Sequence, residues 1–324
     1  RKLIEAGHEV AVFHRGRTAS EVPGASSIPG DYGRLGEYAS QFRDFRPEVV
    51  LDMIPATGKQ ALRVMDTFRG LARRVVAISS QDVYRAWGVV LGIESGLEDP
   101  LLIEESPLRE ALFVFRGRPA PKYNFLQNPD HYDKIPVEKI VMGDPELPGT
   151  ILRLPMVYGP GDPLHRLYPY LKRMDDGRAF ILLDESAAQW RAPVGYVENM
   201  ADAIVLAVMD NRAAGRIYNV AEPDSPSQAE WVRDIGHATG WQGRVVVVPR
   251  TLLPGPRCRL EQHCVSDTRR IRSELEYREA VPRQEALRRT AEWERSHPPE
   301  EPGAIDYAAE DRILAEWESV GTPR

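Results

Sequence analysis

The sequence has 324 residues, of which 42% are hydrophobic and 28% are charged. This composition is typical of a folded protein and excludes a disordered chain. No apolar run approaches the ~18 residues that a membrane-spanning helix needs. The formal net charge of -6 argues against a protein whose main task is to bind nucleic acid. We expect a cytoplasmic protein without a membrane partner, in which nucleic acid is not the favoured partner, and we leave a homodimer open.

The first seven residues have the pattern of a helix end, because Gly7 stands where a helix-stopping glycine is expected. Short strands then alternate with helices. Each strand is rich in Val, Ile or Leu without in-out alternation, as in a parallel sheet that is buried on both faces. The expected strands are residues 9–13, 49–53, 74–79 and 150–154, and the expected helices are residues 35–45, 58–71 and 132–143. This order predicts an α/β protein with a doubly wound parallel sheet, whose ligands bind beyond the carboxyl ends of the strands.

Three further segments complete the expected organisation. Residues 86–131 form a polar, proline-containing insertion in the first domain (1–160), and it is either a lid or a surface excursion. Residues 161–300 are expected to form a smaller α+β substrate cap that partly returns to the core. Its expected helices are residues 164–173, 197–209, 228–239, 268–275 and 283–296, with short strands at 180–183, 217–220 and 245–248. Residues 301–324 should carry a last amphipathic helix, capped by Asp306.

The chain contains two cysteines, Cys258 and Cys264. Together with His263 they give at most three metal ligands, at a spacing that matches no common zinc pattern. We expect inert thiols in a reducing compartment and no metal site.

Five segments in chain order resemble one family. The segments at 76–84 (VAISSQDVY) and 152–160 (LRLPMVYGP) are similar to the fifth and sixth strands of extended short-chain dehydrogenases/reductases, the NAD(P)-dependent epimerase/dehydratase family. The segment at 132–138 (YDKIPVE) resembles the catalytic helix of that family. The segments at 196–203 (YVENMADA) and 217–220 (IYNV) resemble its substrate-domain signatures. The resemblance implies a Rossmann-like, dinucleotide-binding first domain.

The resemblance implies three catalytic residues, Ser80, Tyr132 and Lys134. Ser80 would polarise a substrate oxygen, although a serine at a strand end also often caps the next turn. Lys134 would bind the nicotinamide ribose and lower the pKa of a nearby tyrosine, although a solvated pair with Glu138 is the alternative. The family places its tyrosine four residues before the lysine, where this chain has Asp130. Tyr132 can replace it only if the helix begins after Tyr132, which Pro136 permits because proline is tolerated in a first helical turn.

Other residues are assigned to the cofactor. The first predicted strand runs into Arg15 and Arg17, whose guanidinium groups suit a 2′-phosphate, so we favour NADP over NAD. The alternative is an exposed basic turn. The resemblance adds further cofactor contacts at Asp31, Tyr32, Met53, Ile54, Pro55, Ser79 and Pro155, besides Lys134.

The substrate side departs from the family. We assign Gln81, Asp82, Met156 and Arg191 to it. Nucleotide-sugar enzymes of the family often have Asn where this chain has Met156. Arg191 could hold a phosphate or be a lone exposed arginine. These departures indicate an atypical branch.

The expected function is hydride exchange between a nicotinamide and a carbinol or carbonyl carbon, with a nucleotide-sugar as one candidate substrate. If the hydride is returned, the outcome is epimerisation or dehydration. The alternative is a non-catalytic NADP-binding regulator or an RNA-associated homologue, which the displaced tyrosine favours.

The beginning of the chain leads to one further expectation. In this fold, a first strand and a glycine-rich turn that binds the pyrophosphate precede the helix ending at Gly7. The sequence contains neither, so roughly 20 residues of a complete βαβ unit are missing. We expect a sheet without its first strand, and weak dinucleotide binding by the chain as given.

Overall fold

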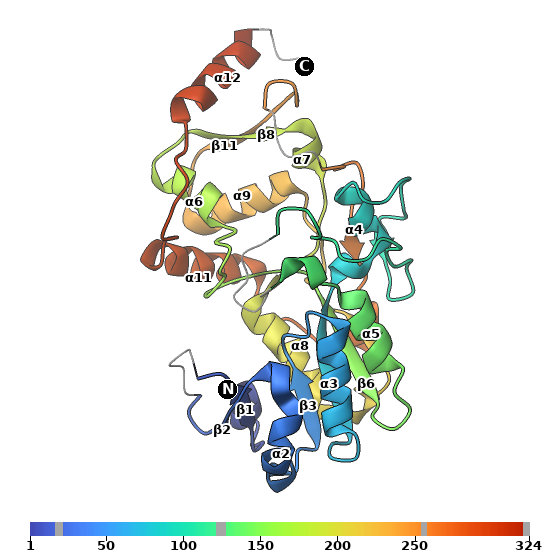
Figure 1. Ribbon diagram of the computed structural model, residues 1–324. Helices are drawn as coiled ribbons and strands as arrows, with labels where there is room; N and C mark the ends of the chain where they lie inside the picture. The colour runs from blue at the N-terminus through green and yellow to red at the C-terminus, as the bar shows by residue number, and fades with distance from the viewer. Residues whose placement is uncertain (17–21, 121–127, 254–257, 320–324) are drawn as a thin grey trace.

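A parallel sheet of four strands, the central sheet, lies in the lower half of Figure 1. The structure, a computed structural model, describes residues 1–16, 22–120, 128–253 and 258–319. The strands lie in the order β10 (Ile217–Asn219), β6 (Gly149–Leu154), β4 (Arg74–Ser80) and β3 (Val49–Asp52), and all of them are parallel. The six residues of β4 from Arg74 to Ser79 are all buried, which explains its unbroken apolar run.

Helices cover both faces of this sheet. Val75 and Ala77 of β4 pack in one apolar cluster with residues of α3 (Gly58–Phe68) and α5 (Lys134–Met142). The alternate residues Val76 and Ile78 pack in another with α8 (Val197–Met209) and α10 (Arg269–Glu274). Because successive strand residues face opposite sides, this is the doubly wound α/β architecture that the sequence predicts.

The N-terminal part adds a second, separate pair of strands. After α1 (Lys2–Glu5), β1 (Ala11–His14) pairs in parallel with β2 (Ser26–Pro29). Within the described ranges, no strand pairing joins this pair to the central sheet. The chain then passes through the 3-10 helix η1 (Tyr32–Tyr38) and α2 (Ala39–Phe45) to the central sheet. The strand β2 was not predicted, because it is mostly exposed and lacks the apolar run of the other strands.

The described residues of the insertion form short elements. These are α4 (Arg85–Val90), β5 (Leu101–Leu102) and η3 (Pro129–His131), preceded by η2 (Gln81–Val83) at the end of β4. The strand β5 pairs with β12 (Val265–Ser266), so the insertion is joined to a distant part of the chain.

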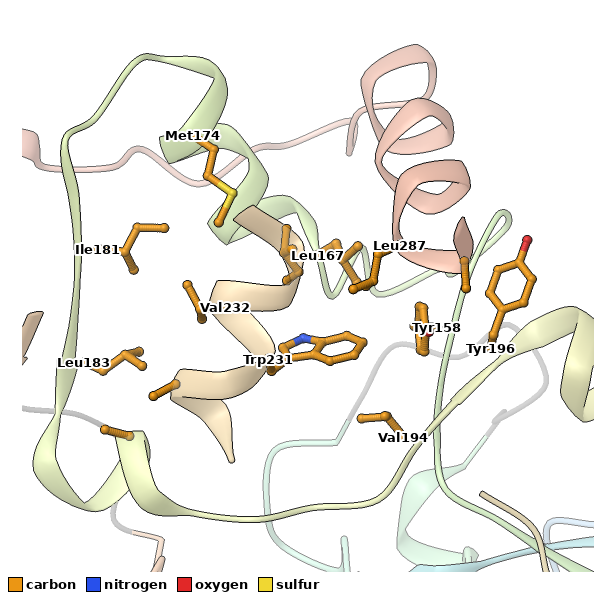
Figure 2. Packing of buried hydrophobic residues seen from close by; sticks show 14 residues of the cluster. Tyr158, Leu167, Met174, Ile181, Leu183, Val194, Tyr196, Trp231, Val232 and Leu287 are labelled. Atoms are coloured by element: carbon orange, nitrogen blue, oxygen red, sulfur yellow. The ribbon is translucent and has the colours of Figure 1, made fainter. Parts of the chain in front are cut away.

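The smaller α+β part lies at the upper left of Figure 1, beside α4 of the insertion. Its strands form two parallel pairs, β7 (Met156–Tyr158) with β9 (Val194–Tyr196) and β8 (Phe180–Asp184) with β11 (Arg244–Val248). Its helices are α6 (Tyr168–Asp175), α7 (Glu185–Gln189), α9 (Gln228–Thr239) and α11 (Arg283–Ser296), and the short η4 (Asn211–Ala213) follows α8. Figure 2 shows Trp231 of α9 at the centre of its core. The strand β10 was expected in this part, but it pairs with β6 in the central sheet.

The last helix, α12 (Tyr307–Ser319), packs against the β8–β11 pair. Asp306 accepts a hydrogen bond from the Ala309 backbone N–H at 2.9 Å, so it caps the helix as predicted. None of the helices in the described ranges is long and apolar enough to cross a membrane. The domain boundaries at 160 and 300 stay predictions.

Candidate functional site

The site lies where β3 and β4 end, because parallel neighbours bring their carboxyl ends to one edge of the sheet. Asp52 is the last residue of β3 and is 6% exposed. Its carboxylate accepts a hydrogen bond from the Tyr32 hydroxyl at 2.6 Å and one from the Ile54 backbone N–H at 3.3 Å. Burial raises the pKa of Asp52 above its ordinary value, because the charged form loses its hydration.

Ser80 is the half-buried last residue of β4. Its Oγ accepts a hydrogen bond from the Asp82 backbone N–H at 3.2 Å, so Ser80 caps η2. The turn-capping role considered as the alternative is therefore present. It does not use the hydroxyl hydrogen, which can still be donated to a ligand oxygen.

Lys134 is the first residue of α5 and is 5% exposed. Its ammonium donates to the backbone carbonyls of Pro55 and Ile78, each at 2.8 Å. The loop after β3 and the end of β4 are thereby tied together. Burial lowers the pKa of Lys134 to about 8, although the negative charges of Asp52, Asp82 and Glu138 oppose this shift. The solvated pair with Glu138 considered as the alternative is not formed.

Tyr132 precedes α5 in an extended conformation, with φ -68° and ψ 123°. The helix begins only at Lys134 because the Asp133 side chain accepts the Ile135 N–H at 2.9 Å and caps it. This is the condition under which Tyr132 can approach the site. Its hydroxyl donates to Asp82 Oδ2 at 2.9 Å, and its ring centre lies 6.0 Å from the Lys134 ammonium nitrogen.

The insertion is fixed to this edge by a buried ion pair. Arg109 Nη2 lies 3.3 Å from Asp133 Oδ1, and both side chains are almost fully buried. The same guanidinium donates from Nε to the Asp82 backbone oxygen at 2.5 Å. Asp133 Oδ2 accepts the Phe113 N–H at 2.6 Å. The start of α5, the end of β4 and the insertion are thus joined through two side chains.

A second buried network lies behind the site. Ser79 donates to Glu138 Oε1 at 2.6 Å, and Glu138 binds the Arg153 guanidinium with contacts of 2.9 and 2.7 Å. Arg153 also donates to the Tyr84 hydroxyl at 2.9 Å and to the Glu104 carbonyl at 2.8 Å. Ser79, assigned to the cofactor from the sequence, is 2% exposed and points into this network.

The remaining cofactor candidates differ in exposure and in their partners. Asp31 is exposed and caps η1 by accepting the Gly33 N–H at 2.8 Å. Met53 and Ile54 are 51% and 40% exposed, so they offer apolar surface at the end of β3. Arg15 is exposed beyond β1, and Arg17 lies outside the described residues. Tyr32 and Pro55 are occupied with Asp52 and Lys134 as stated above, and Pro155 is half-buried between β6 and β7.

The substrate candidates are dispersed. Gln81 is 1% exposed, and its amide nitrogen donates to Val220 O and Ser266 Oγ, so it acts as an internal cross-link. Met156 is half-buried against the apolar core of the smaller part. Arg191 is paired with Glu230 at 3.0 Å. Of the four candidates, Asp82 is the one whose side chain contacts the Ser80–Tyr132–Lys134 group.

Sequence reasoning missed Asp52, Arg109 and Arg153. Two of them had a usable signal, because Asp52 and Arg153 are charged residues within apolar strands, where a charge requires a partner. Arg109 had no such signal. It lies in an irregular segment, and its partner follows 24 residues later in the chain.

The comparisons with known proteins agree with the fold. Residues 134–221 match the model of the NAD dependent epimerase/dehydratase family. This segment is similar to that family. It begins at Lys134 and includes β6, β7, β9, α8 and β10, so it spans the end of the central sheet and its junction with the smaller part. No curated protein matches the sequence.

Solved epimerase and dehydratase structures share the fold over almost the whole chain. A putative epimerase from Burkholderia cenocepacia has a TM-score of 0.66 at 18% identity, with 91% of this chain and 92% of that chain covered. UDP-glucose 4-epimerase from Thermotoga maritima, solved with UDP-glucose, has a TM-score of 0.62 at 18% identity, with 91% and 93% covered. The dTDP-glucose 4,6-dehydratase of Bacillus anthracis, solved with NAD, has a TM-score of 0.62 at 14% identity, with 91% of each chain covered. At such identities, the likeness establishes the Rossmann-like fold of the epimerase/dehydratase family.

Proposed function

We propose that the protein uses a nicotinamide dinucleotide to exchange hydride with a carbinol or carbonyl carbon, as an enzyme of the epimerase/dehydratase type. One observation supports this most strongly. Ser80, Tyr132 and Lys134 are all tied to the segment from Ile78 to Asp82, where β4 ends, by hydrogen bonds of 2.8 to 3.2 Å. Their functional groups therefore converge where a doubly wound sheet binds its ligand.

The residues present fit the nicotinamide end of such a cofactor. Lys134 uses two of its three N–H donors on Pro55 and Ile78, which leaves one for a ribose hydroxyl. Met53 and Ile54 expose apolar surface beside it. The bound cofactor would supply the hydride acceptor and donor. Asp31, exposed after β2, is proposed to contact the adenine side.

In this proposal Ser80 donates its hydroxyl hydrogen to the substrate oxygen and stabilises charge that develops there. Tyr132 exchanges the proton of that oxygen. Lys134 holds the ribose and keeps the positive charge next to the reacting groups. These roles rest on the hydrogen-bonding geometry of the three side chains.

The cofactor form and the substrate are proposed from charge and likeness. Arg15 and Arg17 would favour the 2′-phosphate of NADP. Nucleotide-sugars are the proposed substrates, because similar structures were solved with UDP-glucose. Return of the hydride would give epimerisation or dehydration.

The test combines binding with turnover. Calorimetric titration with NADP and NAD should show binding, tighter for NADP, and a panel of UDP- and dTDP-sugars should include one that is converted. Tyr132→Phe should lower turnover by about 10²–10⁴-fold, because proton transfer is lost. Tyr218→Phe is the matched control, since Tyr218 is buried and bonded to Glu274 away from the site.

The results separate the candidate functions. Turnover that survives Tyr132→Phe would remove the proposed proton carrier. Dinucleotide binding with no conversion of any sugar would support a non-catalytic regulator instead. Preference for NAD would contradict the role given to Arg15 and Arg17.

A further inference from the structure

The side chain of Asp82 contacts the hydroxyl of Tyr132. It donates to Asp82 Oδ2 at 2.9 Å. The Lys134 ammonium is held by two carbonyl oxygens and lies over the ring of Tyr132, 6.0 Å from its centre. The lysine thus lies over the ring of Tyr132, whereas Asp82 accepts the hydrogen bond of the hydroxyl itself.

Asp82 is held firmly in place. Its backbone N–H is bonded to Ser80 Oγ, and its backbone carbonyl accepts Arg109 Nε. Among the described residues, its Oδ1 is buried without a hydrogen-bond partner. One carboxylate oxygen thus faces Tyr132, while the other is shielded from water and unused.

We infer that Asp82 is a positioning residue that exchanges the Tyr132 proton, so that Tyr132 and Asp82 act as a two-residue proton relay. The inference rests on the proposed function. As the substrate O–H bond breaks, its proton passes to Tyr132 Oη, and the Tyr132 hydroxyl proton passes to Asp82 Oδ2. The electron pair of the breaking C–H bond leaves as hydride to the oxidised nicotinamide dinucleotide, and a carbonyl remains. In the reverse direction, Asp82 returns the proton.

The surroundings of Asp82 support its role as a base. Burial raises the pKa of Asp82, and the negative charge of Asp133 adds to this effect. The charges of Arg109 and Lys134 and the hydrogen bond from Tyr132 act in the opposite direction. A carboxylate with a raised pKa is a stronger base than an ordinary aspartate, and it accepts a proton more readily at neutral pH.

The first test measures the ionisation of Tyr132 directly. The absorbance of tyrosinate is titrated in each protein and in its Tyr132→Phe counterpart, and the difference reports Tyr132. Loss of the Tyr132 proton would leave a phenolate oxygen next to the Asp82 carboxylate, and the repulsion between these two negative charges makes the proton hard to remove. Asp82→Asn should therefore lower the pH at which Tyr132 ionises by about 1 unit or more.

A second tyrosine–carboxylate hydrogen bond, away from the site, provides the control. Tyr158 donates to Glu222 at 2.8 Å in the smaller part of the molecule. Glu222→Gln should leave the Tyr132 titration unchanged. An unshifted Tyr132 titration in Asp82→Asn would overturn the inference.

A reciprocal measurement does not require Asp82→Asn to fold. Infrared titration of the Asp82 carboxyl compares the natural protein with Tyr132→Phe, which removes a hydrogen bond that stabilises the carboxylate. The pKa of Asp82 should then rise further, and an unchanged pKa would contradict the pairing.

Activity separates this inference from the proposed function. In the oxidation direction, turnover should fall as the pH decreases through the pKa of Asp82, since the protonated carboxyl cannot accept the Tyr132 proton. Asp82→Asn should lose this acid limb together with most of kcat. If each of Tyr132 and Asp82 shifts the titration of the other but no substrate is converted, the pairing is supported and the proposed function is rejected. If a substrate is converted but Tyr132 and Asp82 titrate independently of each other, only the proton relay is rejected.

Discussion

At the scale of single residues, Lys134 is a buried charge whose pKa is lowered by the loss of its hydration. Its ammonium is buried, and two carbonyl dipoles and three nearby carboxylates only partly replace its lost hydration. The folded chain therefore releases this proton at a pH of about 8, whereas its ordinary value is 10.5. Below about pH 8, keeping Lys134 charged costs folding free energy, and this cost disappears as the pH rises toward 10.5.

This sign gives a prediction for stability. Between about pH 8 and pH 10.5 the unfolded chain holds the proton that the folded chain has lost, so the contribution of Lys134 to the free energy of unfolding rises with pH. The expected rise is on the order of 2–3 kcal/mol. Urea unfolding at both ends of this range measures it, and Lys134→Met should remove it.

Lys139→Met, on the exposed face of the same helix, is the control and should keep the rise. An equal pH dependence in Lys134→Met and the natural protein would show that Lys134 titrates normally.

Ser80, Tyr132 and Lys134 were named together from the sequence because the family resemblance implies them. The hydrogen bond from Tyr132 to Asp82 was not predicted, because it joins residues 50 positions apart. Spacing on an ideal helix places Tyr132 on the wrong side. The cap at Asp133 removes that restriction, and its effect depends on the folded backbone.

At the scale of elements, strongly periodic helices were predicted well. The helices α8, α9 and α11 have the bounds expected from the sequence. Two failures have physical causes. The strand β2 has too little buried surface to show an apolar run, and α5 starts late because a side chain, Asp133, caps it.

The helix α12 offers an element-scale prediction. Ile313, Leu314 and Trp317 pack against Phe180 and the other apolar residues of the β8–β11 pair. Trp317→Ala should lower the free energy of unfolding by roughly 2 kcal/mol, since it removes a large, partly buried ring. Thermal unfolding followed by circular dichroism measures the change.

Arg312→Ala on the exposed side of α12 is the comparison and should change stability by less than about 0.5 kcal/mol. If both variants behave alike, α12 contributes no packing to the β8–β11 pair.

At the scale of the whole molecule, Arg153 connects parts that are distant in sequence. From β6, it reaches Glu138 on α5, Tyr84 after β4 and the Glu104 carbonyl in the insertion. At 2% exposure it has no access to water, so its charge depends on these partners. Together with the Arg109–Asp133 pair and the β5–β12 pairing, this guanidinium therefore holds the insertion against the sheet.

Arg153→Leu should therefore destabilise the protein by about 3–5 kcal/mol, because it leaves Glu138 buried and unpaired. Adding Glu138→Leu should recover part of this loss, since the uncompensated charge is then removed. Urea unfolding of the single and double variants measures both effects.

Arg34→Leu provides the contrast. It breaks an exposed pair with Glu37 and should cost less than about 1 kcal/mol. A double variant as unstable as Arg153→Leu would show that the lost hydrogen bonds, rather than the buried charge, determine the effect.

The cap at Asp133 also limits how this protein can evolve. Irregular surface segments usually tolerate insertions and deletions. Here the carboxylate that starts α5 also binds Arg109 and the Phe113 N–H, so residues 109–113 cannot change in length without moving the start of α5. Such a move would displace the Tyr132 hydroxyl. Insertions and deletions should therefore be confined to the parts of the insertion outside residues 109–113. This segment has little regular structure, yet its length is as constrained as that of β4.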